Sequence, residues 1–255
     1  MHNRPNRCYI LSGASRGLGL GMARAIAAQG DHLIALARQE TPELAQLGAA
    51  LPGYRFVAVD LANTDQVSEV AEELLGSLAA MDWQGIYLIN NAGVVEPIGP
   101  AGSYGDAEMA RCLTVNLTAA IQFSNAFLRH LRDRPCDKRI LQISSGAGRN
   151  AYTGWSAYCA SKAGLDMYNR CVGLEQADLP HPVRMASLAP GIIDTGMQAS
   201  IRATPEGDFP LLEQFRQYQA NGELADPDSR GLAILQLLHT DHIGHGAVLN
   251  IRDFI

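Results

Sequence analysis

Long hydrophobic runs are absent from this chain of 255 residues, and basic residues are few. No apolar stretch approaches the roughly 18–20 residues that a membrane-spanning helix needs, so we predict no transmembrane segment. Lysine and arginine together number 20 against 26 aspartates and glutamates, which gives a net charge of −6. This acidic balance argues against a nucleic-acid-binding protein and against a protein held on a membrane by a basic patch. We predict neither kind of partner.

Cysteine is also scarce, and its pattern bears on the cellular compartment. The five cysteines are widely spaced and include no C-x-x-C pair, so we predict reduced thiols rather than a disulfide framework. Only the four apolar residues Cys8–Leu11 precede a glycine-rich stretch, which is too short for the hydrophobic core of a secretion signal. Both observations predict a cytoplasmic protein.

A metal site is not expected either. His239, His242 and His245, with Asp241, have a spacing that would suit a metal ion. They span the expected end of a helix, however, where imidazoles interact favourably with the helix dipole. We therefore predict no bound metal.

Short apolar segments alternate with helical patterns along the whole chain. Most of the apolar segments lack polar alternation, as expected for parallel strands buried on both faces. The predicted strands are Cys8–Leu11, Leu33–Ala37, Arg55–Val59, Gly85–Ile89, Arg139–Ile143, Val183–Leu188 and Ala247–Ile251. The predicted helices are Leu20–Ala28, one that begins at Asn63 or Thr64, Asp106–Arg132, Ala157–Ala177 and Asp228–His239.

This alternation predicts an α/β fold, a Rossmann-like doubly wound seven-stranded parallel sheet. We expect one domain over residues 1–255, since no linker or repeat divides the chain. Residues 196–222 lack a strand and contain Pro205 and Pro210. We predict that this segment forms a lid over the substrate.

A glycine-rich segment, SGASRGLG, follows the first predicted strand and leads into a helix. Gly13, Gly17 and Gly19 stand in this turn. Glycines let such a turn tighten and let backbone N–H groups approach a pyrophosphate at the positive end of the helix dipole. The spacing differs from G-x-G-x-x-G, and an ordinary glycine-rich turn stays open as an alternative. The position between strand and helix favours dinucleotide binding.

Tyr158 and Lys162 form a Y-x-x-x-K pair within a predicted helix. Residues four apart share a helix face, so the phenol and the ammonium are expected to be neighbours. A phenol has an ordinary pKa of about 10, and a cation fixed nearby lowers it towards neutrality. Such a pair is usually a solvated face, but lysine occurs only twice in the chain, and Ser145 stands thirteen residues upstream. Ser144 is the rival serine at that position.

The ordered set of motifs resembles the short-chain dehydrogenase/reductase family over essentially the whole chain. The set comprises the glycine motif, Asn90–Gly93, Asn116, Ser145, Tyr158 with Lys162, and Pro190–Thr195. Stretches such as Ser144–Asn150 and Asp194–Gln198 resemble the branch of bacterial benzil reductases and sepiapterin reductases. The aspartate that anchors the pterin in sepiapterin reductases falls here on Asn250.

The resemblance implies four catalytic residues. Tyr158 would protonate the carbonyl oxygen, and Ser145 would hydrogen-bond that oxygen. Lys162 would hold the nicotinamide ribose and lower the pKa of Tyr158, and Asn116 would support a water-linked proton relay. The implied cofactor contacts are Gly13, Ser15, Arg16, Gly17, Leu18, Gly19, Arg38, Asp60, Leu61, Asn91, Ala92, Gly93, Tyr158, Lys162, Pro190, Gly191, Ile193 and Thr195.

NADP(H) is the expected cofactor. Relatives that prefer NAD place an acid at the end of the second strand, where this chain has Ala37 followed by Arg38. Arg38 and Arg16 suit a 2′-phosphate, which an acid would repel. The alternative is that both arginines are ordinary surface charges.

The expected activity is reduction of a ketone, with an aromatic or bulky α-dicarbonyl or a pterin side-chain ketone as substrate. Tyr152, Trp155 and Met197 would line the substrate pocket, with Phe209 further along the lid, and such a lining favours flat apolar groups with few charges to hold an anion. A 3-oxoacyl thioester reductase and a catalytically silent dinucleotide-sensing scaffold are the alternatives. The apolar surface of the 157–177 helix predicts a homodimer or homotetramer.

Overall fold

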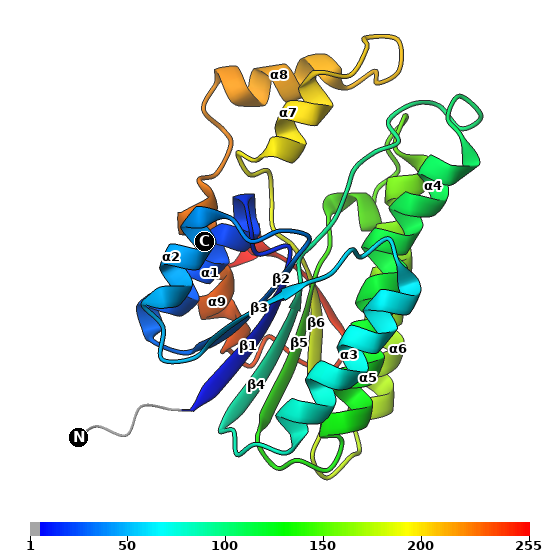
Figure 1. The fold of residues 1–255 in the computed structure, drawn as a ribbon. Coiled ribbons are helices and arrows are strands. Elements are labelled where there is room, and N and C mark those ends of the chain that lie inside the picture. Colours follow the sequence, from blue (N-terminus) through cyan, green and yellow to red (C-terminus); the bar gives the residue numbers. More distant parts are fainter. Residues whose placement is uncertain (1–5) are drawn as a thin grey trace.

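The computed structural model describes residues 6–255, so residues 1–5 of the predicted domain lie outside the described part. Seven parallel strands form one sheet in the order β3-β2-β1-β4-β5-β6-β7 (Figure 1). The predicted doubly wound α/β fold is therefore confirmed. The strands are β1 (Arg7–Ser12), β2 (His32–Ala37), β3 (Tyr54–Ala58), β4 (Gly85–Asn90), β5 (Asp137–Ile143), β6 (Arg184–Ala189) and β7 (Ala247–Asn250).

Helices cover both faces of the sheet. In Figure 1, α1, α2 and α9 lie on one side and α3, α5 and α6 on the other, while α7 and α8 stand above the carboxyl ends of the strands. The helices are α1 (Gly17–Gln29), α2 (Pro42–Ala49), α3 (Thr64–Ala79), α4 (Asp106–Leu113), α5 (Ala119–Leu131), α6 (Ser156–Gln176), α7 (Gly196–Arg202), α8 (Leu212–Ala220) and α9 (Pro227–Leu238). No helix within residues 6–255 is long and apolar enough to cross a membrane.

Three local differences from the prediction have clear causes. α2 was not expected, yet Thr41 caps its first turn through Leu44 N and Pro42 begins it. α1 begins at Gly17 rather than at Leu20, because the glycine turn itself enters the helix. The single helix predicted over 106–132 is interrupted by a π-helical segment, Thr114–Thr118, between α4 and α5.

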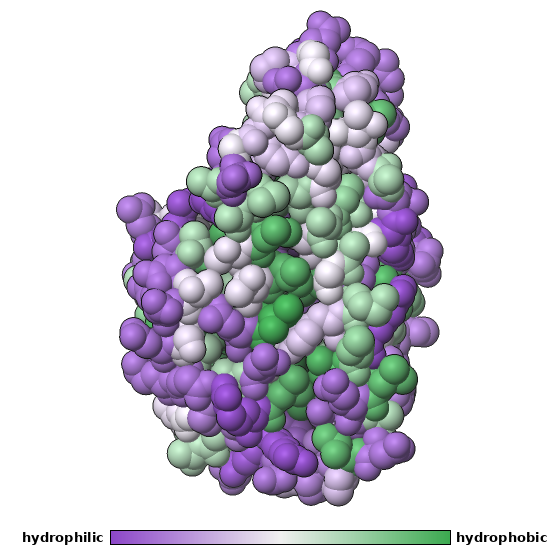
Figure 2. Space-filling model, turned by 90° about the vertical axis from the view of Figure 1, so that its right-hand side faces the viewer, coloured by the Kyte–Doolittle hydropathy of each residue, from purple (hydrophilic) through white to green (hydrophobic). Residues whose placement is uncertain are grey.

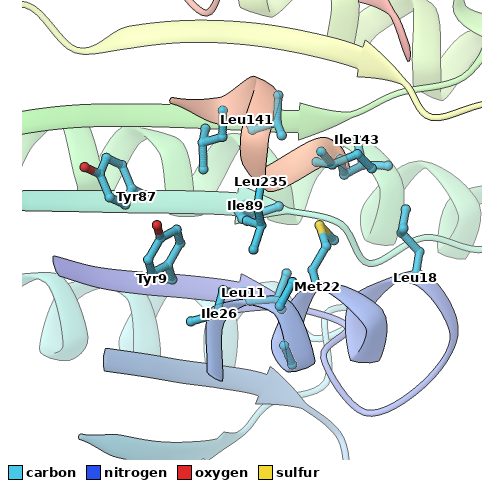
Figure 3. Packing of buried hydrophobic residues seen from close by; sticks show 14 of the residues in the cluster. Tyr9, Leu11, Leu18, Met22, Ile26, Tyr87, Ile89, Leu141, Ile143 and Leu235 are labelled. Carbon is cyan, nitrogen blue, oxygen red and sulfur yellow. The ribbon is translucent and has the colours of Figure 1, made fainter. Parts of the chain in front are cut away.

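The core has one layer on each face of the sheet because adjacent strand residues point in opposite directions. Tyr9 and Leu11 of β1 face α1 and α9, whereas Ile10 between them faces α3 and α5. Figure 3 shows the first layer, in which Met22 of α1 and Leu235 of α9 pack against the same face of the sheet. A third apolar cluster lies beneath α7 and α8. These layers hold the carboxyl ends of the strands in place.

Lys138, one of the two lysines, has a structural role. Its side chain is only 1% exposed, and its ammonium donates hydrogen bonds to the carbonyl oxygens of Leu131, Arg132 and His181 at 2.9, 3.1 and 2.7 Å. Two of these carbonyls belong to the end of α5, where a cation meets the negative end of the helix dipole. Both lysines of the chain, Lys138 and Lys162, are therefore buried.

His239, at the end of α9, forms a partly buried pair with Tyr9 of β1. Its Nε2 lies 2.7 Å from the Tyr9 hydroxyl, and Asp137 and two arginines, Arg7 and Arg139, act on it electrostatically. Burial lowers the pKa of His239 to about 4, and both arginines act in the same direction while Asp137 opposes them. The imidazole is therefore neutral in the folded protein at neutral pH.

This shift predicts a pH dependence of stability. An unfolded histidine has a pKa of about 6.5. Between about pH 6.5 and 4, the imidazole of His239 is therefore protonated in the unfolded chain but not in the folded protein, and folding stability decreases as the pH is lowered. We expect wild type to lose about 2 kcal/mol more than His239→Gln between pH 7 and 4.5. Urea unfolding of both proteins across this range measures the difference, with His242→Gln as the exposed control. Equal losses in wild type and His239→Gln would contradict the assignment.

Candidate active site

A cavity of about 380 Å³ opens at the carboxyl ends of β1, β2, β4, β5 and β6. This edge is where a doubly wound sheet places its ligand, because the strand order reverses between β1 and β4. Every residue that the sequence proposed as a cofactor contact lines this cavity, as do Ser145 and Met197. Asn116, Tyr152 and Trp155 do not.

The glycine loop has the geometry of an anion cradle. Gly13 and Gly17 have φ values of +68° and +53°, which disfavour other residues. A Cβ atom at Gly19 would lie 2.0 Å from the carbonyl oxygen of Gly13. Arg16 makes no side-chain cap at the start of α1, and no acidic residue stands in the first turn. The N–H groups that begin α1 are therefore available to a pyrophosphate, and the loop fits a dinucleotide.

The glycine loop is held against the start of the β4–α4 connection. The Ser12 hydroxyl accepts hydrogen bonds from the backbone N–H groups of Asn91 and Ala92 at 3.0 and 3.1 Å. The Asn91 amide returns a bond of 2.9 Å to the carbonyl oxygen of Ser12. Two motifs 79 residues apart thus form one rigid wall of the cavity.

Arg16 and Arg38 line the cavity near the end of β2. Both are exposed, and neither forms an ion pair with another residue in the part of the chain that the structure describes. Ala37 ends β2 beside Ala58 of β3, so no carboxylate stands at this position. The two guanidinium groups are available to an anion.

Tyr158 and Lys162 lie on the face of α6 that borders the cavity. They are 6% and 4% exposed, and the Lys162 Nζ atom lies 5.9 Å from the centre of the Tyr158 ring. Lys162 donates a hydrogen bond of 2.9 Å to the carbonyl oxygen of Ile143 at the end of β5. The pair is therefore adjacent, as its spacing predicts.

The predicted direction of the tyrosine pKa is wrong for the protein without ligand. Burial raises the pKa of Tyr158 to about 12, although the Ser145 hydroxyl acts in the opposite direction. Burial also lowers the pKa of Lys162 to about 8, opposed by Cys112 and Asp166. Burial disfavours the charged form of each group and so determines the direction of both pKa shifts. A protonated phenol at neutral pH suits a proton donor.

Ser145 begins the turn between β5 and α6. Its hydroxyl oxygen accepts from Ala147 N at 3.2 Å, so its hydrogen can donate, and a hydrogen bond from Ser145 acts to lower the pKa of Tyr158. Ser144 also lines the cavity, but its hydroxyl is buried and has no partner within residues 6–255.

Asn116 lies in the π-helical segment and is 1% exposed. Its amide oxygen accepts from Val94 N at 2.8 Å, and its amide nitrogen donates to Val94 O at 2.8 Å and to Ser161 Oγ at 3.1 Å. π-Helical turns recur at functional sites. The amide nitrogen also lies 3.4 Å from Cys112 Sγ of α4. The side chain thus joins the β4–α4 connection to α6 next to Lys162, and these are the contacts of a positioning residue.

Of the three residues predicted to line the substrate pocket, Met197 lines the cavity, whereas Tyr152 and Trp155 pack beside it. Trp155 stacks on Phe209 with ring centres 4.9 Å apart and an interplanar angle of 15°, and its edge meets Tyr158. Tyr152 packs against Trp155 instead of lining the cavity. The turn at Gly154, with φ +85°, carries this segment onto the base of α7 and α8. Trp155 therefore packs directly against the Tyr158 ring, and Tyr152 and Phe209 pack against Trp155.

Several polar residues of the cavity wall were missed from the sequence. Glu96 and the exposed Arg111 add charge to the wall, contrary to the expectation of few charged groups, and Gln198 and Ser200 come from α7. Gln198 followed the recognised motif Pro190–Thr195 and could have been proposed from that position alone. Arg111 precedes Val115 by one helical turn, and Val115 also lines the cavity.

No group of three or more histidine, cysteine or acidic side chains with the arrangement of a metal site was found within residues 6–255. His239 instead contacts Tyr9 and Tyr87.

Residues 7–206 match the family described as short chain dehydrogenase. The chain belongs to this family and is an oxidoreductase that acts on CH–OH and C=O groups with a nicotinamide dinucleotide. It is 39% identical over 247 residues to the benzil reductase ((S)-benzoin forming) of Bacillus subtilis (strain 168), covering 97% of this chain and 99% of that protein.

Two further comparisons agree with this assignment. The sepiapterin reductase of Meriones unguiculatus is 31% identical over 255 residues, covering 96% of this chain and 95% of that protein. The crystal structure of the KRED1-Pglu enzyme superimposes with a TM-score of 0.81 at 27% identity, covering 95% of this chain and all of that one. The predicted family and its benzil and sepiapterin reductase branch are confirmed.

Proposed function

We propose that this protein is an NADPH-dependent carbonyl reductase that reduces one carbonyl of an aromatic or bulky α-dicarbonyl to a hydroxyketone. The observation that carries the proposal is the buried phenol of Tyr158, beside Lys162, on the wall of a cavity with a dinucleotide cradle. Similarity to a benzil reductase over nearly the full length supports the substrate class.

The proposed chemistry divides among three residues. When bound, the nicotinamide supplies the hydride. Tyr158 donates its proton to the carbonyl oxygen as negative charge develops there. Ser145 donates its hydroxyl hydrogen to the same oxygen. Lys162 has N–H groups beyond the one bound to Ile143 O, and these would hold the ribose hydroxyls.

Asn116 keeps the β4–α4 connection against α6 and so maintains the position of Lys162. Residues 196–222 would serve as the substrate lid, because α7 contributes cavity-lining residues from above the sheet. We place the enzyme in the cytoplasm on the basis of its five free thiols.

Pterin ketones and acyl thioesters are the competing substrates. The similarity to a sepiapterin reductase favours the first, while Asn250 stands where the pterin-anchoring aspartate was expected. A screen of NADPH oxidation with benzil, sepiapterin and an acetoacetyl thioester separates them. We expect the highest kcat/KM with benzil. Activity confined to the thioester would transfer the assignment to a 3-oxoacyl reductase, and absence of turnover with every substrate would favour the sensing scaffold.

A homodimer or homotetramer formed through α6 is part of the proposal. Figure 2 shows a band of hydrophobic residues along the face that carries α3, α5 and α6. On α6, Met167 and Leu174 are 54% and 77% exposed, and the Cys171 thiol is also exposed. Contiguous apolar surface of this kind marks an interface.

This interface predicts the effect of one charge. We expect Leu174→Glu to convert the oligomer to a monomer in light scattering at micromolar concentration, because the carboxylate would be buried unpaired against the second copy. Met81→Glu introduces the same charge at a residue that is 49% exposed near the end of α3 and should leave the oligomer intact. A monomeric wild type would contradict the proposal.

A further inference from the structure

Gln198 is a polar residue of the cavity wall with an unsatisfied amide. It lies in the first turn of α7 and is only 7% exposed. Its Oε1 atom is buried and has no hydrogen-bond partner among residues 6–255. Burying an amide without a partner is destabilising, so an unsatisfied amide on the wall of a binding cavity indicates a ligand that hydrogen-bonds to it.

The surroundings of Gln198 connect it with the reacting centre. Thr195, three residues earlier, caps α7 and lies against Gly17 of the glycine loop. Met197 packs in the apolar cluster that contains Tyr158 and Trp155. Gln198 thus stands where the dinucleotide-binding wall passes into the lid. A half-turn of the amide group exchanges its oxygen and nitrogen, so it can offer a donor to the cavity.

The catalytic residues leave one oxygen of an α-dicarbonyl without a donor. In the proposed mechanism, Tyr158 and Ser145 both donate to the oxygen of the carbonyl that is reduced. The oxygen of the adjacent carbonyl loses its hydrogen bonds to water when the substrate is buried, and it needs a hydrogen-bond donor from the protein in their place.

We propose that Gln198 determines specificity by donating a hydrogen bond from its amide to the carbonyl oxygen that is not reduced. This inference rests on the proposed function. It explains why the lid keeps a buried amide on the cavity wall, and it makes the enzyme selective for dicarbonyls over monoketones of the same shape. A site built to hydrogen-bond a substrate discriminates strongly against an analogue that lacks the group.

Arg202 provides the competing explanation. It lies one turn further along α7, and its Nη1 atom is also buried without a partner in residues 6–255. An amide that paired with this guanidinium would stabilise the lid for every substrate alike. If Gln198 binds the second carbonyl, mutation of Gln198 weakens only ligands that have this carbonyl. If Gln198 pairs with Arg202, the mutation weakens ligands with and without it equally.

The test compares Gln198→Leu with wild type on two ligands that share both phenyl rings. Benzil has two carbonyls, and deoxybenzoin has one. We expect kcat/KM for benzil to fall at least tenfold in the variant, while the inhibition constant of deoxybenzoin, measured as a competitor of benzil, changes less than twofold. Gln219→Leu, on an exposed face of α8, is the matched control and should change neither value.

Gln198→Glu keeps the shape of the side chain and replaces the donor by an acceptor, so it should reproduce the benzil-specific loss if Gln198→Leu folds poorly. Equal losses with benzil and deoxybenzoin would overturn the inference in favour of the Arg202 role, and an unchanged kcat/KM for benzil would overturn it outright. A wild type that does not reduce benzil would instead contradict the proposed function, before any variant is compared.

Discussion

Replacing Tyr158 with phenylalanine is expected to lower kcat by about 10²–10⁴-fold, which is the usual contribution of a positioned general acid. The variant keeps the ring, which packs edge-on against Trp155 with centres 5.5 Å apart. Only the buried hydroxyl is lost. The melting temperature and the dissociation constant for NADPH should therefore stay close to those of wild type.

Stopped-flow or steady-state rates with benzil measure the loss, and fluorescence titration measures cofactor binding. Tyr168→Phe is the matched control because Tyr168 lies on the same helix but donates its hydroxyl to Asn125. Its turnover should be nearly unchanged. A loss of less than tenfold in Tyr158→Phe would remove the phenol from the proton-transfer step.

Replacing Arg38 with glutamate is expected to lower kcat/KM for NADPH by about 100-fold while leaving kcat/KM for NADH within a few fold. A hydrogen bond between charged groups contributes about 1.5–3 kcal/mol, or 10- to 100-fold, and the new carboxylate would also repel the 2′-phosphate. Arg38 forms no ion pair with another described residue, so its removal breaks no internal pair.

The same kinetics on wild type test the cofactor preference directly. Arg55→Glu makes the same change of charge on the neighbouring strand β3, outside the cavity. It also breaks the exposed ion pair of Arg55 with Glu73, and it should affect the two cofactors alike. Equal kcat/KM values for NADH and NADPH in wild type would contradict the assignment of Arg16 and Arg38 to the 2′-phosphate.

The sequence alone determined the sheet and the outline of the cavity. Strands such as β1 and β4 are nearly continuous apolar runs, and this pattern has no stable solution except burial on both faces of a parallel sheet. The glycine turn, Asn91 and Thr195 follow strand ends, and the ends of parallel strands meet at one edge. Their convergence on one cavity therefore follows from order along the chain.

Tertiary packing decided what the side chains do within this outline. The spacing of Tyr158 and Lys162 predicted adjacency correctly, but the direction of each pKa depends on desolvation by residues distant in sequence. Trp155 is an aromatic residue of the kind that lines pockets, but its ring stacks on Phe209, which lies 54 positions later in the chain. In the sequence, Gln198 is only the last residue of a stretch that resembles related reductases, and no role is predicted for it. Its importance arises from burial without a partner, which is a property of the folded chain and not of any local pattern.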